Sequence, residues 1–227
     1  MIPFKKFINE SLRGIIPSPI HFKYVNKTLN EKESNPSIHS WTKHNDNSHL
    51  GNSSGDISKK LDGSNNFTSK HETHVKKGYT SHDGEAINRN LIKGGIYGPH
   101  KNAVTHIDDA VDKNKIKHHV HVYSGLSFDP KKHIKDGKFH SPSYISATHD
   151  KPTSLKFAKT DSVKKPMHIA HIKLKPGDSA SHISKISFEP HEHETLIKRG
   201  QTLIHHGSIL HKDESGNKIH IHHFTME

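Results

Sequence analysis

The apolar residues of this chain are unevenly distributed, and this feature most constrains how the chain can fold. From about residue 30 to residue 76, Ser, Asn, Gly, His and Lys dominate, and apolar residues stand singly without a period of 2 or 3.6. Only 29% of the chain is hydrophobic, so such a segment buries too little apolar surface to offset the conformational entropy lost on folding. We therefore expect an amphipathic targeting helix at residues 1–14, a flexible basic linker at 15–77 and one folded domain at 78–227.

The expected folded domain begins with helical patterns and continues as strands. Helices are expected at 85–93, around 107–111 and at 152–158, where apolar residues recur at helical spacing. Strands are expected at 120–123, 167–174, 183–188, 195–197, 203–206, 209–211 and 218–224, with a hairpin turn at 213–217. Helices followed by consecutive strands indicate an α+β domain with a mainly antiparallel sheet assembly.

The charge of the chain favours some partners and excludes some chemistry. Its 34 Lys and Arg exceed its 23 Asp and Glu, for a net charge of +11, which either attracts polyanions (nucleic acid, an anionic membrane or acidic proteins) or only solvates the surface. The absence of cysteine excludes disulfides and thiolate metal sites.

No apolar run approaches the ~20 residues needed to span a bilayer, so we expect no membrane partner. The N-terminus has no apolar stretch behind its lysines, so we expect no secretory signal there. We expect the protein to be a monomer.

Histidine is unusually abundant, with 26 residues in the chain. Neutral imidazole is a common metal ligand, and two histidines at i and i+2 of a strand share a face, as His220 and His222 would. The histidines are nevertheless spread along the whole chain, as a compositional bias would spread them. We therefore expect no metal site, and metal binding is the weakest of three hypotheses for function.

Three short segments carry residues of the kinds found in catalytic sites. Two carboxylates at positions i and i+2 where a strand begins should point to the same face of the sheet. Two like charges so close together raise the pKa of at least one of the two carboxyls, and a raised pKa suits a general base. Each segment alone is a weak signal, so the argument depends on their combination and order. They are Tyr123-Ser124-Gly125; Tyr144-Ile145-Ser146-Ala147-Thr148 with Phe157-Ala158; and Glu192-His193-Glu194 with Leu196, Ile197, Arg199 and Gly200.

In this order and spacing, the segments resemble the Arg-Ser-Glu class of mono-ADP-ribosyltransferases, which includes bacterial exoenzyme toxins and phage-encoded transferases. Upstream, Tyr79-Thr80 and Ile87-Asn88 with Leu91 are similar to the opening motif of that class. The resemblance covers about residues 78–227. It implies an ADP-ribosyltransferase fold of two packed, mainly antiparallel sheets with flanking N-terminal helices, preceded by a disordered arm. It also implies NAD as the substrate, held between the sheets.

The resemblance further implies a role for each matched residue. Glu194 would hold the ribose 2′-hydroxyl of NAD and stabilise the oxocarbenium-like transition state. Glu192 would orient or deprotonate the acceptor, and a glutamate there implies an arginine side chain as acceptor. Ser146 would position Glu194 and contact NAD. The other expected NAD contacts are Tyr123, Ser124, Gly125, Thr148 and Phe157, with a mobile closing loop at 159–166.

Ser124 departs from the pattern of the class, which has an arginine at this position that holds an NAD phosphate. Serine keeps a hydrogen-bond donor but loses the charge and the bidentate reach. Ile145 and Ala147 also depart from the Thr-Ser-Thr-Ser strand of the class. The second hypothesis is therefore a basic internal head protein that binds DNA and carries a degenerate, inactive transferase fold.

The first ten residues carry a second resemblance. Phe4-Lys5-Lys6-Phe7-Ile8-Asn9-Glu10 is similar to the capsid-targeting sequence of internal head proteins in tailed phages, which is trimmed after an Ile-x-Glu motif, here before Ser11. This implies a protein located in the virion and then in the host cytoplasm, with host bacterial proteins as acceptors. A secreted, toxin-like effector is the alternative.

Overall fold

The computed structural model describes residues 38–63, 65–81, 83–95, 98, 100–158, 166–213 and 216–227. The helix expected at 1–14 lies outside these residues. So do the first part of the expected linker and nearly all of the loop expected to close over NAD.

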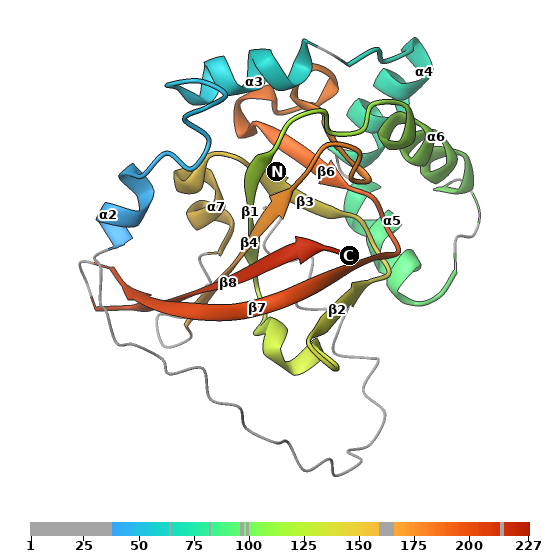
Figure 1. Ribbon diagram of the computed structural model, residues 1–227. Coiled ribbons are helices and arrows are strands. Elements are labelled where there is room, and N and C mark those ends of the chain that lie inside the picture. Colours follow the sequence, from blue (N-terminus) through green and yellow to red (C-terminus); the bar gives the residue numbers. More distant parts are fainter. Residues whose placement is uncertain are drawn as a thin grey trace.

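Eight strands form the centre of the fold (Figure 1). They are hydrogen-bonded into one sheet in the order β2-β7-β8-β4-β1-β3-β6-β5, and every neighbouring pair is antiparallel except β4 and β8. The α+β class is thus confirmed. The strands are β1 (Val120–Leu126), β2 (Lys138–Ser141), β3 (Ile145–Thr148), β4 (Met167–Leu174), β5 (Ala180–His182), β6 (Glu194–Ile197), β7 (Gln201–Lys212) and β8 (Lys218–Met226).

The sheet has two halves that meet where β1 pairs with β3. The register there contains a single residue pair, Tyr123 with Thr148, whereas β1 and β4 pair along the full length of β1. The two sheets expected from the resemblance are therefore joined by hydrogen bonds at one narrow point. Because the pairing ends there, the two halves can diverge and leave room for a cleft.

One strand prediction was wrong, and two predicted strands proved to be continuous. Residues 183–188 form no strand but contain the 3₁₀ helix η3 (Ser184–Ile186). The buried residues Ile183 and Ile186 are three apart, which is the period of a 3₁₀ turn. The strands expected at 203–206 and 209–211 are one strand, β7, with an irregularity between His205 and Gly207. Gly207 has a φ of 124°, so the strand bends there without ending.

The described part of the expected flexible linker, residues 38–77, is folded against the sheet, which corrects the linker prediction. It contains α2 (Ile38–Lys43), α3 (Ser54–Asp62), α4 (Ser69–Glu72) and most of the π-helix η1 (Thr73–Tyr79). The apolar residues of this segment are few, but four are at least 93% buried: Ile38, Leu50, Ile57 and Leu61. The last three belong to the same core cluster as Val120 and Val122 of β1.

Polar contacts with distant parts of the chain also fix this segment. The side-chain amide of Asn47 donates to the backbone oxygen of His121 and accepts from its backbone N–H, both at 2.8 Å, so it acts as an extra strand partner. The buried His71 ring lies 2.7 Å from the carboxylate of Asp109. Such contacts have no local periodicity, which is why sequence patterns did not predict them.

The remaining helices position the site. Figure 1 shows α4, α5 (Asp83–Ile92) and α6 (His100–Lys113) gathered at the end of the sheet that carries β6, while α7 (Lys151–Ala158) lies beside β1 and β4. Two further 3₁₀ turns are η2 (Pro130–His133) and η4 (Pro190–Glu192). Among the described residues, no helix is both long and apolar enough to cross a bilayer.

Candidate active site

The three motif segments lie on three neighbouring strands. Tyr123 of β1 pairs with Thr148 of β3, and Thr148 in turn pairs with Glu194 of β6. Segments that are up to 71 residues apart in the chain thus meet at the narrow point between the two halves of the sheet.

Glu194 is the buried carboxylate of this site. Only 6% of the residue is exposed, and the Ser146 hydroxyl donates a hydrogen bond to its Oε1. Burial raises the pKa of the Glu194 carboxyl to about 7, against hydrogen bonds from Ser146 and Ser187, and the charge of Glu192 adds to the rise. The structure therefore brings Ser146 and Glu194 together as expected, and Glu194 changes its charge near neutral pH.

Tyr79 and Asn88 complete the surroundings of Glu194. Tyr79 is 5% exposed, and its pKa is raised by burial and by the neighbouring Glu194 carboxylate. The Asn88 amide donates to the Tyr79 hydroxyl at 3.1 Å and accepts from the backbone N–H of Tyr144, also at 3.1 Å. The opening motif thus braces the β3 segment beside Glu194, a contact that the sequence motifs did not predict.

Glu192 lies in a turn and not in a strand, which differs from the expectation. It does not share a strand with Glu194, because it ends the turn η4, and β6 begins only at Glu194. His193 between them has a φ of 52°, a left-handed conformation that costs of the order of 1–3 kcal/mol in a non-glycine residue. Glu192 is half-buried, and its pKa is raised by burial and by Glu189.

The strained His193 is held by a residue of the expected linker. Its Nδ1 lies 2.7 Å from the Ser58 hydroxyl, on α3. The same hydroxyl lies 3.1 Å from Nε2 of His182, which is buried on β5. Helix α3 therefore fixes the backbone between the two glutamates, which explains how a strained residue persists there.

A cleft opens next to Ser146. Its wall includes both Ser124 and Ser146, as well as apolar side chains of β1, β4 and β8 and of the loop after β1. The buried Ser124 hydroxyl donates to the backbone oxygen of Ser146 at 2.7 Å. Ser124 thus braces the strand that carries Ser146, and it contributes no positive charge to the cleft.

The other four residues expected to contact NAD make different contacts in the structure. Tyr123 is 1% exposed and packs edge-on against Trp41, while its hydroxyl donates to Asp46. Gly125 lies under the backbone of α7, near Phe157. The Thr148 hydroxyl accepts from the backbone N–H of Asp150 at 3.0 Å and so caps the turn into α7. None of the four is among the residues that line the cleft, and the observed contacts of Tyr123, Gly125 and Thr148 support the fold around it.

Comparison with known families agrees with this geometry. The model of the ADP-ribosyltransferase exoenzyme family matches residues 22–225, which is most of the chain. The chain belongs to this family. The match begins upstream of residue 78, in agreement with the folded residues 38–77. No curated protein sequence matches the chain.

Solved structures of the exoenzyme type share the fold at low sequence identity. The C3 exoenzyme of Clostridium limosum superposes with a TM-score of 0.62 at 16% identity, over 77% of this chain and 93% of that one. C3stau2 from S. aureus, solved with NAD, gives 0.59 at 16% identity, over 77% and 95%. The toxin BECa of C. perfringens, solved with NADH, gives 0.56 at 19% identity, over 83% of this chain and 47% of that one.

The arginine of the third motif is a structural residue in this exoenzyme-family member. Arg199 donates through Nη2 and Nε to Oδ2 of Asp108 at 2.7 and 3.0 Å, and the Tyr144 hydroxyl donates to Oδ1 at 2.7 Å. One carboxylate of α6 therefore ties together residues of the second and third motifs. No signal in the sequence singled out Asp108, because its partners are distant in the chain.

Proposed function

We propose that the protein is an NAD-dependent mono-ADP-ribosyltransferase that modifies arginine side chains of host bacterial proteins. The observation that carries the proposal is the buried Glu194 carboxylate, held by Ser146 next to a cleft, in a chain of the exoenzyme family. The residues fit NAD as substrate, because a carboxylate that is shielded from water stabilises a nearby developing cation more strongly than an exposed one.

The reaction follows from these roles. The bond between nicotinamide and ribose C1′ breaks, neutral nicotinamide leaves, and positive charge develops on the ribose, which the Glu194 carboxylate stabilises. A guanidinium nitrogen of the acceptor then forms a bond to C1′ and loses a proton. Glu192, half-buried two residues before Glu194, is suited to receive that proton and to hold the planar guanidinium through both carboxylate oxygens.

Substitutions in this loop test the acceptor and the role of Glu192. We expect Glu192→Gln to lower transfer of labelled ADP-ribose to agmatine, a small guanidinium compound, by roughly 10²-fold, which is the lower range for loss of a positioned base. Hydrolysis of NAD, in which water replaces the acceptor and nicotinamide is released, should continue because Glu194 is intact. The matched control is Glu189→Gln, which removes a carboxylate from the same loop and should change neither rate more than a few-fold.

The outcomes separate the hypotheses. Transfer to agmatine that is undiminished in Glu192→Gln would rule out the proposed role of Glu192. Transfer to lysate proteins without transfer to agmatine would reject the arginine acceptor. A parent protein that neither binds NAD in calorimetry nor releases nicotinamide would support the alternative, a basic head protein with an inactive transferase fold.

The proposed location of the protein is based on the sequence alone. We place the protein in a phage head and then in the host cytoplasm because residues 4–10 resemble a capsid-targeting sequence, and a secreted effector is the alternative. These residues lie outside the described part of the chain. After treatment with the prohead protease of the phage, the chain is expected to begin at Ser11 by mass spectrometry. An intact N-terminus would reject the virion assignment.

A further inference from the structure

Three side chains of metal-binding type converge beside residues that line the cleft. Asp129 follows β1, His168 belongs to β4 and His222 to β8, and one ligand atom of each lies within 4.8 Å of the others. Nδ1 of His168 lies 3.0 Å from Nε2 of His222 and 3.9 Å from Oδ1 of Asp129. We infer that Asp129, His168 and His222 bind one divalent transition-metal ion, with zinc preferred by this nitrogen and oxygen donor set.

The distances suit a metal site. Zinc bonds of about 2.0–2.2 Å at tetrahedral angles place two ligand atoms about 3.3 Å apart. The observed 3.0 and 3.9 Å lie on either side of this value, so small side-chain rotations suffice. The strands hold the two imidazoles in place, because Ala170, two residues from His168 on the same face of β4, is the register partner of His222.

Hydrogen bonds within the protein leave this cluster incompletely satisfied. His168 and His222 are 8% and 0% exposed. At 3.0 Å two facing ring nitrogens can share only one proton, so one of them presents a lone pair. Among the described residues, Nδ1 of His222 and Nε2 of the neighbouring His205 are buried without a hydrogen-bond partner. Because Nδ1 and Nε2 of one imidazole point in different directions, an ion at Nε2 of His222 would use the lone pair that faces His168, and Nδ1 would need a separate partner such as a buried water.

A second cluster of the same composition serves as an internal comparison. Asp46, His121 and His171 also lie within reach of one another. There, however, the Lys151 ammonium lies 2.8 Å from Asp46 Oδ2, and the Tyr123 hydroxyl donates to the same atom. A cation already neutralises that carboxylate, so we assign that cluster to the internal hydrogen-bond network.

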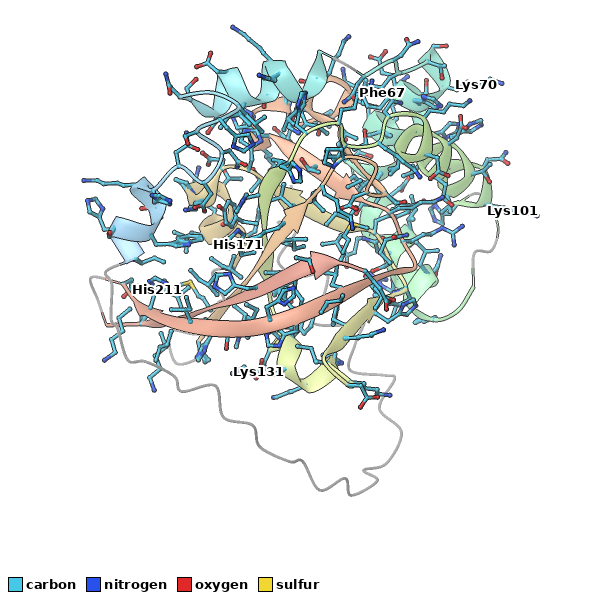
Figure 2. The ribbon with its side chains drawn as sticks, viewed as in Figure 1. Phe67, Lys70, Lys101, Lys131, His171 and His211 are labelled. Carbon is cyan, nitrogen blue, oxygen red and sulfur yellow. The ribbon has the colours of Figure 1, made fainter. Side chains whose placement is uncertain are left out.

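The charges around the proposed site act in both directions. Lys131 and Lys132 of η2 are within electrostatic range of His168 and weaken the attraction for a cation, while Asp129 strengthens it. The Asp129 side chain is 31% exposed, so an ion can enter from solvent. Figure 2 labels Lys131, which belongs to η2, and His171, which belongs to the comparison cluster.

The position of the site links it to the cleft. Phe128 and Pro130, which flank Asp129 in the chain, line the cleft, as do Ala170 and Phe224. Ser124 lies on the same wall and is neutral. A bound divalent ion would therefore bring positive charge to the cleft wall that carries Ser124, the position where the class has an arginine that holds an NAD phosphate. This consequence, unlike the metal site itself, rests on the proposed function.

The experiment uses the untagged full-length protein, freed of metal with a chelator, and zinc as the probe. Calorimetry, together with elemental analysis after gel filtration, is expected to show one tightly bound ion per chain. Asp129→Asn should weaken this binding at least tenfold. The asparagine oxygen can still accept the N–H of Lys131, which Asp129 accepts at 3.0 Å, so the variant should fold. Asp46→Asn is the matched control in the comparison cluster and should leave the ion bound.

The results distinguish the metal site from its link to NAD. If the protein bound no tight ion at one per chain, the metal site would be rejected, whether or not the protein cleaves NAD. The same holds if Asp46→Asn lost the ion and Asp129→Asn kept it. One ion per chain that requires Asp129 would support it, even if the protein proved unable to cleave NAD. NAD affinity measured with and without zinc tests the link, which an unchanged affinity would reject.

Discussion

Replacing Glu194 by glutamine is expected to lower both ADP-ribose transfer and nicotinamide release between about a hundredfold and a thousandfold, the usual loss when one preorganised electrostatic contact to a transition state is removed. Glutamine keeps the shape and a hydrogen bond to Ser146 but removes the negative charge. The measurement is the initial rate of nicotinamide release at saturating NAD. Glu189→Gln, in the same loop, should retain the parental rate.

The same substitution should stabilise the fold, but only above a certain pH. Burial raises the pKa of Glu194 from 4.5 to about 7, so the folded state binds this proton more tightly than the unfolded state. Ionising Glu194 therefore costs stability, and the cost grows as the pH rises from about 4.5 to about 7 and is constant above. Glutamine removes up to about 3 kcal/mol of this cost at pH 8, or roughly 6–12 °C in Tm.

The comparison of parent and Glu194→Gln melting temperatures at pH 8 and pH 4.5 checks this effect. The gain in Tm should be clear at pH 8 and nearly absent at pH 4.5. The other titratable groups facing Glu194 are Glu192 and Tyr79, and both are unchanged in the variant. An equal Tm gain at both pH values would mean that Glu194 is not the group that titrates.

Gly125→Ala is expected to destabilise the protein by about 3 kcal/mol or more, at the upper end of the usual cost of overpacking. A Cβ at this position would lie 2.5 Å from the backbone nitrogen of Ala158 and 2.6 Å from the backbone oxygen of Ser154. Backbone atoms of a packed helix cannot rotate away, so α7 must shift off β1. Because β1 also carries Ser124, the shift should lower NAD affinity in any variant protein that remains folded.

The matched control is Gly137→Ala, at a turn where φ is 75° and no heavy atom lies within 4 Å of an added Cβ. There the cost is only that of a left-handed backbone, about 1–2 kcal/mol. Urea denaturation of both variants separates the two effects. Equal losses would show that α7 does not pack as closely on β1 as the structure indicates.

Some features of the site could be predicted from the sequence because they are local. Ser146, Glu192 and Glu194 stand in short motifs whose order along the chain is readable, and five of the eight residues over 167–174, where β4 was expected, are apolar. The conformation of Glu192 could not be read in this way. A strand period placed it beside Glu194, whereas the left-handed His193 places it in a turn, and that conformation depends on Ser58, 135 residues away.

The sequence by itself determined the α+β class, the order of the motifs and the serine at position 124, because these depend on residue identity and local periodicity. Only the tertiary structure decided that residues 38–77 are part of the domain, that one residue pair joins the halves of the sheet, and that Asp129, His168 and His222 meet. The physical reason is the same in each case. A sparse apolar segment or a scattered histidine gains its free energy from partners far along the chain, and no local pattern records where those partners will lie.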